Sequence, residues 1–97
     1  MSSIMEKLKY DRDTINLIGR KYGASNIRIF GSVLHADDRP DSDIDLLVDF
    51  DPERSLFDLI GLKLELEEFL GKNVDVVTDR GLHPEIADHV LREAVSL

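Results

Sequence analysis

Apolar side chains recur at the 3.6-residue spacing of an α-helix in three stretches of the chain. The first spans residues 3–22, and Gly23 directly after it is the left-handed stop that commonly ends a helix. The last begins at Pro84, because proline suits the first turn of a helix. We expect two amphipathic helices, the first packing through Ile4, Leu8, Ile15, Ile18 and Tyr22 and the last through Ile86, Val90, Ala94 and Leu97.

The middle helical stretch, residues 56–70, is rich in leucine. Ser55 followed by Asp58 resembles a capping box at its start, and Gly71 provides the stop at its end. These signals predict a helix with well-defined ends. We expect it to pack on the core through Leu56, Leu59, Ile60, Leu66 and Phe69.

Three short segments between the helices have the pattern of β-strands. Residues 27–30 are rich in β-forming side chains and close on Gly31-Ser32, whereas residues 74–77 form a short valine-rich run. Residues 42–50 alternate, so one face of that strand should be dry and the other acidic. The expected acidic face carries Asp43, Asp45, Leu47 and Asp49, and the dry face carries Ile44, Leu46, Val48 and Phe50.

The elements follow in the order α-β-β-α-β-α, without a repeat or a linker. We therefore expect an α/β (α+β) fold in which a small three-stranded mixed sheet is covered by helices on one face. The other face of the sheet is left for chemistry. A chain of 97 residues is long enough for one hydrophobic core, so residues 1–97 are expected to form a single domain.

The composition excludes several kinds of protein. The chain has no cysteine, which excludes a disulfide framework, a thiol nucleophile and a cysteine-ligated metal. An excess of 20 acidic over 12 basic side chains gives a net charge of −8, which opposes unaided binding to nucleic acid. No apolar run approaches the about 18 residues of a membrane span, and no signal peptide precedes the first helix, so we expect a cytoplasmic protein.

Acidic side chains are concentrated in one part of the chain. Seven of the 13 aspartates lie between Asp37 and Asp51. Asp43 and Asp45 are two residues apart on the predicted strand, so their carboxylates leave the same face with Cα atoms about 7 Å apart. Two carboxylates about 4 Å apart repel by about 4 kcal/mol at an effective dielectric constant of about 20. A divalent cation such as Mg²⁺ or Mn²⁺ would offset that cost.

Two further features favour a metal site over a solvated strand edge, which would be the simpler interpretation of Asp43 and Asp45 alone. Asp75 lies between two valines that face the core, which directs its carboxylate to the acidic face. Three carboxylates there could hold two metal ions about 4 Å apart, an arrangement that serves in-line nucleotidyl transfer. Gly31-Ser32 could hold phosphates, because glycine lets the backbone approach and the serine hydroxyl donates a hydrogen bond.

The spacing of these residues resembles a known signature. Gly31-Ser32, then ten residues, then Asp43-Ile44-Asp45 is similar to the GSx10DxD signature of the DNA polymerase β-like nucleotidyltransferase superfamily. The sequence around Asp45, the later Asp75 and the start of the last helix at Pro84 resemble the minimal nucleotidyltransferases, so the likeness covers essentially the whole chain.

The resemblance implies an antitoxin that transfers AMP from ATP to a tyrosine of a partner toxin with a HEPN ribonuclease domain. It implies Asp43 and Asp45 as metal ligands, Asp75 as the third carboxylate, and Gly31-Ser32 as the phosphate-binding turn. It also implies Mg²⁺ as the metal and a hetero-oligomer with the toxin. Asp75 is our candidate for positioning or deprotonating the acceptor hydroxyl.

One loop departs from the family's pattern. The family's Gly-Ser-Arg-Ala-Arg-Gly loop reads Gly31-Ser32-Val33-Leu34-His35-Ala36 here, without either arginine. This change predicts weaker ATP binding, different partner contacts, or binding without catalysis. Two other functions stay open at this point. One is a non-catalytic antitoxin that neutralises its partner by binding, and the other is a small-molecule nucleotidyltransferase similar to the aminoglycoside-modifying branch.

Overall fold

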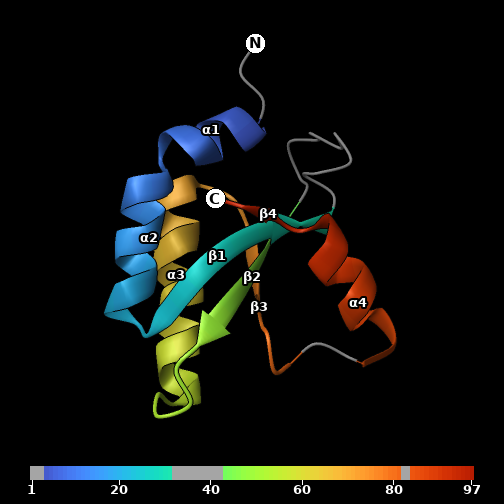
Figure 1. The fold of residues 1–97 in the computed structure, drawn as a ribbon. Coiled ribbons are helices and arrows are strands. Elements are labelled where there is room, and N and C mark those ends of the chain that lie inside the picture. The colour runs from blue at the N-terminus through green and yellow to red at the C-terminus, as the bar shows by residue number, and fades with distance from the viewer. Residues whose placement is uncertain (1–3, 32–42, 82–83) are drawn as a thin grey trace.

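The structure is a computed structural model that describes residues 4–31, 43–81 and 84–97 (Figure 1). No helix within these ranges is both long enough and apolar enough to cross a membrane. The elements in chain order are α1 (Ile4–Tyr10), α2 (Arg12–Lys21), β1 (Ala24–Phe30), β2 (Ile44–Phe50), α3 (Leu56–Leu70), β3 (Val74–Thr78), α4 (Pro84–Glu93) and β4 (Val95–Ser96).

The strands form one mixed sheet in the order β3-β2-β1-β4. β1 runs antiparallel to β2 and β4, and β2 runs parallel to β3. The three longer strands were predicted, but β4 was not. The last helix ends at Glu93, so Ala94 and Leu97 lie outside it, contrary to the expectation from spacing. Val95–Ser96 instead pairs with β1, and the Leu97 backbone N–H donates to the Ile27 carbonyl at 3.0 Å, which satisfies polar groups at this edge of the sheet.

The main hydrophobic core lies between the sheet and the helices α1, α2 and α3. Ile44, Leu46 and Val48 of β2 face this core with at most 1% exposure, as the alternation predicted. α4 stands on the other side of the sheet (Figure 1), so the expectation that helices cover only one face is wrong for the last helix. Leu47, on this second side, is fully buried rather than open to solvent. We attribute its burial to α4, whose Val90 is also buried and needs an apolar partner.

The predicted helix over residues 3–22 is two helices, because the chain bends at Asp11. This residue has φ −92° and ψ 9°, which departs from helical geometry, and aspartate is a poor helix former. The bend lays α1 across the ends of α2 and α3 (Figure 1). Leu8 and Ile15 therefore both reach the core with 0% exposure. Gly23, with φ +88°, follows α2 as predicted.

Both ends of α3 lie where the sequence predicted them. The Asp58 carboxylate accepts a hydrogen bond from the Ser55 backbone N–H at 3.1 Å, and Gly71 ends the helix with φ +69°. The buried face matches the predicted one only at Leu66. The buried residues are Leu62, Leu66 and Leu70, whereas the expected core residues found exposed are Leu56, Ile60 and Phe69. Apolar residues occupy almost every side of this helix, so their spacing could not show which side meets the core.

Two glutamates of α3 fasten this helix to its surroundings. Glu65 Oε1 accepts a hydrogen bond from Lys21 Nζ of α2 at 2.8 Å. Glu67 Oε2 accepts hydrogen bonds from Lys63 Nζ at 2.8 Å and from the Val74 backbone N–H of β3 at 3.0 Å. The lysine hydrogen bonds are the main reason that the pKa of each glutamate is lowered, because they stabilise the charged carboxylate.

We expect the double variant Glu65→Gln/Glu67→Gln to lose less stability on acidification than the unaltered chain. A carboxylate with a lowered folded-state pKa stabilises the fold above its unfolded-state pKa, at about 4.3, and this stabilisation disappears as the pH falls through the folded-state pKa. The Tm of the variant should therefore fall less steeply between about pH 6 and about pH 3. Thermal unfolding followed by circular dichroism measures this slope, with Glu68→Gln on the exposed side of α3 as the control. Equal slopes for the double variant and the unaltered chain would contradict the prediction.

Candidate active site

The register between β2 and β3 places Asp45 directly beside Asp75. Paired residues of neighbouring strands lie about 4.8 Å apart and send their side chains to the same face. The pair Ile44 and Val74, one residue earlier on each strand, is 1% exposed and faces the main core. The two aspartates therefore face away from that core. This is the arrangement that the valines on either side of Asp75 predicted.

Gly31 brings the end of β1 against the Asp45 carboxylate. It follows Phe30, which pairs with Asp45 in the antiparallel β1–β2 ladder. Gly31 has φ +77°, and a Cβ atom added to it would overlap Asp45 Oδ2. Glycine satisfies both demands, because it adopts positive φ without strain and has no side chain to collide. A backbone turn of the kind expected to bind phosphate thus lies against one of the paired carboxylates.

Two other residues of the predicted site, Asp43 and Ser32, are not seen to join the Asp45–Asp75 pair. Asp43 lies just before β2 and is exposed. Within residues 4–31, 43–81 and 84–97, no group of three or more histidine, aspartate or glutamate side chains could hold a metal ion. The structure therefore brings together Asp45 and Asp75, without Asp43 completing a cluster of three. Ser32 and the departing loop residues Val33–Ala36 lie outside the described residues.

The donor chemistry of the Asp45–Asp75 pair fits a hard divalent cation. Both side chains offer only carboxylate oxygen, which Mg²⁺ and Mn²⁺ prefer as a ligand. Asp45 is half-buried and Asp75 is exposed, so a cation can approach the pair from solvent. Two negative charges at adjacent register positions repel each other, and a bound cation would remove that cost.

Arg28 lies on the same face of the sheet and forms an ion pair with Asp49. Arg28 pairs with Leu47 in the β1–β2 ladder, which places it on the face of Asp45. Its guanidinium forms an ion pair with Asp49, and its side chain is only 14% exposed. Asn26 Nδ2 also donates to Asp49 Oδ2 at 3.1 Å. Asp49 thus has structural partners within the sheet. Sequence reasoning missed Arg28, although its position between two isoleucines was a usable signal.

Comparison with known proteins identifies the family. Residues 6–97 match the family model described as polymerase beta, nucleotidyltransferase. The chain belongs to the polymerase β nucleotidyltransferase family. Among similar members, the protein adenylyltransferase MntA of Thermococcus cleftensis is 43% identical over 75 residues, which cover 77% of this chain and 76% of MntA. MJ0435 of Methanocaldococcus jannaschii, assigned as a protein adenylyltransferase, is 48% identical over 77 residues, which cover 79% of this chain and 83% of MJ0435.

Two solved structures share the fold of this chain. A structure assigned as a minimal nucleotidyltransferase superposes with a TM-score of 0.85 at 46% identity, covering 95% of this chain and 94% of that one. A crystal structure of a toxin–antitoxin with AMP-PNP superposes with a TM-score of 0.75 at 22% identity, covering 89% of this chain and 71% of that one. At that lower identity the likeness concerns the fold alone. The fold predicted from the sequence motif is therefore confirmed, apart from the added strand β4 and the position of α4.

Proposed function

We propose that this nucleotidyltransferase moves AMP from ATP to a hydroxyl group of a partner protein and uses Mg²⁺ to do so. The pairing of Asp45 with Asp75 beside the Gly31 turn carries the proposal, because paired carboxylates next to a glycine turn suit a metal-bound triphosphate. The names of MntA and MJ0435, both protein adenylyltransferases, support a protein acceptor. ATP as donor and an antitoxin role are what the resemblance to the minimal nucleotidyltransferases implies.

The acceptor in this proposal is a tyrosine of a toxin with a HEPN domain, as the sequence resemblance implies. The charge of the chain supports a protein acceptor over a nucleic acid, since a net charge of −8 repels a phosphate backbone. The acceptor hydroxyl is therefore presented by a second chain, and the two form a hetero-oligomer.

Each proposed site residue has a task in the transfer, and Asp75 has two. Asp43 and Asp45, together with Asp75, would hold the metal, and a bound Mg²⁺ would neutralise phosphate charge and align the reacting groups. Gly31 and Ser32 bind the triphosphate through backbone N–H groups and the serine hydroxyl. Asp75 orients the acceptor hydroxyl and takes its proton while the oxygen attacks the α-phosphorus of ATP and the bond to pyrophosphate breaks.

Mass spectrometry of the partner distinguishes this proposal from neutralisation by binding alone. The product of the neighbouring reading frame is incubated with the chain, ATP and Mg²⁺, and its tyrosine peptides are analysed. We expect one of them to gain the mass of AMP, and Asp43→Asn to abolish the gain. Asp51→Asn, at an exposed position just after β2, is the matched control and should keep it. A partner that is inhibited but unmodified would favour the non-catalytic antitoxin, the alternative suggested by residues 33–36.

A further inference from the structure

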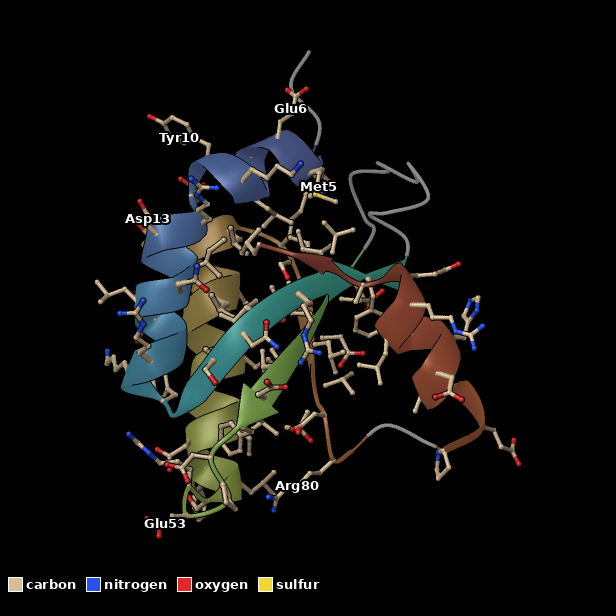
Figure 2. All side chains as sticks on the ribbon, in the orientation of Figure 1. Met5, Glu6, Tyr10, Asp13, Glu53 and Arg80 are labelled. Carbon is tan, nitrogen blue, oxygen red and sulfur yellow. The ribbon has the colours of Figure 1, made fainter. Side chains whose placement is uncertain are left out.

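The two tyrosines of the chain differ in the availability of their hydroxyl groups. Tyr22 is half-buried, and its Oη donates a hydrogen bond to Glu65 Oε1 at 2.7 Å, which is the main reason that its pKa is raised. Its ring lies against Gly61, where an added Cβ atom would come within 2.7 Å of the ring carbon Cε1. Tyr10, at the end of α1, is 89% exposed and points outward from the molecule (Figure 2). Tyr10 is therefore the tyrosine that another protein can reach.

The segment that carries Tyr10 has no net charge, in contrast with the rest of this acidic chain. Between residues 6 and 13 its three basic side chains (Lys7, Lys9 and Arg12) balance three acidic ones (Glu6, Asp11 and Asp13). The candidate active site is acidic, since Asp45 and Asp75 are paired there. An uncharged segment is repelled less by that site than the rest of the chain, which favours encounter of the Tyr10 segment with the active site of a second molecule.

The fold prevents Tyr10 from entering the active site of its own chain. Leu8 anchors α1 in the main core with 0% exposure, on the side of the sheet that α2 and α3 cover. Asp45 and Asp75 face the opposite side of the same sheet, because their neighbours Ile44 and Val74 point into that core. A hydroxyl on α1 therefore has to be modified by another copy of the chain.

We propose that Tyr10 is itself an acceptor of AMP, modified in trans by a second copy of this chain. The proposal rests on the proposed adenylyltransferase activity and adds a second acceptor to it. The Tyr10 phenolic oxygen attacks the α-phosphorus of ATP, the bond between that phosphorus and the pyrophosphate oxygen breaks, and the phenolic proton passes to Asp75 of the second copy. A tyrosine hydroxyl suits this step better than that of serine or threonine, because a phenol is more acidic than an alcohol and its oxygen is easier to expose as a nucleophile. The products are an AMP–tyrosine phosphodiester and pyrophosphate.

Peptide mass spectrometry of the chain incubated alone with ATP and Mg²⁺ tests this proposal. We expect the peptide containing Tyr10 to gain the mass of AMP, with loss of the gain in Tyr10→Phe and retention in Tyr22→Phe. Lys9→Gln/Arg12→Gln leaves the Tyr10 segment with a net negative charge, so it should slow the labelling of Tyr10 while leaving the labelling of the partner unchanged. Mixing inactive Asp45→Asn with active Tyr10→Phe should place the AMP on the Asp45→Asn chain, as transfer in trans requires.

The partner protein, added to a parallel reaction, separates failure of this inference from failure of the proposed function. A modified partner together with an unmodified Tyr10 would overturn the inference and leave the adenylyltransferase activity standing. AMP on a serine, a threonine or Tyr22 of the chain would overturn the choice of Tyr10. If neither the partner nor the chain gains AMP, the proposed function itself is wrong, and this inference is wrong with it.

Discussion

Asp45→Asn should reduce AMP transfer by about a hundred-fold to a thousand-fold, which is the effect of losing one preorganised charge-stabilising group. The substitution keeps the shape of a half-buried side chain at the centre of the candidate site but removes its charge. The site then has one carboxylate fewer with which to attract a cation, next to Asp75 on the paired strand. Because the two shapes are nearly equal, the Tm should stay within a few degrees of the unaltered value. Initial rates of partner labelling and a thermal melt measure the two expectations.

Asp49→Asn is the matched control for this variant, since it removes a charge from the same strand and the same face. Asp49 is bound by Arg28 and Asn26, and losing this ion pair should cost up to about 1 kcal/mol of stability. Transfer of AMP should continue at close to the normal rate. Equal losses of transfer in Asp45→Asn and Asp49→Asn would show that the acidic face acts only through its overall charge.

Asp75→Asn should also lose transfer, by about a hundred-fold to ten-thousand-fold if this residue handles the proton of the acceptor. It differs from Asp45→Asn in the step that it affects. If Asp75 mainly serves the acceptor, calorimetric titration with Mg²⁺ and ATP should show stronger nucleotide binding in Asp75→Asn than in Asp45→Asn. A normal transfer rate in Asp75→Asn would remove this residue from the proposed mechanism.

The central feature of the site could be predicted because strand periodicity and valine placement are strong local signals. Alternation along residues 44–50 fixed the face of Asp45, and the valines beside Asp75 fixed the face of that residue. The resemblance to the minimal nucleotidyltransferases then predicted that Asp75 joins Asp45 in one site. The contact between Gly31 and Asp45 could not be predicted, since it depends on how the β1 turn sits against the next strand.

The errors arose where tertiary packing decides between local alternatives. On α3 the leucines allow several buried faces, and contact with the sheet selected Leu62, Leu66 and Leu70. On β2 the pattern placed Leu47 with the aspartates, and only the position of α4 shows that this part of the face is covered. The chain end had a weak helical pattern, but pairing with the open edge of β1 turned Val95 and Ser96 into a strand.

Two glycines with similar backbone conformations allow the contact between Gly31 and Asp45 to be tested on its own. Gly31 has φ +77° and Gly71 has φ +69°, so an alanine at either position should cost about 1–2 kcal/mol of backbone strain. A Cβ atom added at Gly71 meets no heavy atom within 4 Å, whereas one added at Gly31 overlaps the Asp45 carboxylate. Only Gly31→Ala therefore has to displace a residue of the candidate site.

Gly31→Ala should lower the rate of AMP transfer about a hundred-fold, because a displacement of about 1 Å at a reacting centre has an effect of that size. Gly71→Ala should lower the Tm through the same backbone strain but leave the transfer rate close to normal. Thermal melts and single-turnover labelling of the partner, both well below the Tm of either variant, measure the two effects separately. Normal transfer by Gly31→Ala would mean that the turn after β1 does not position Asp45. A matching loss of transfer in Gly71→Ala would attribute the effect to stability, because Gly71 ends α3 and lies outside the candidate site.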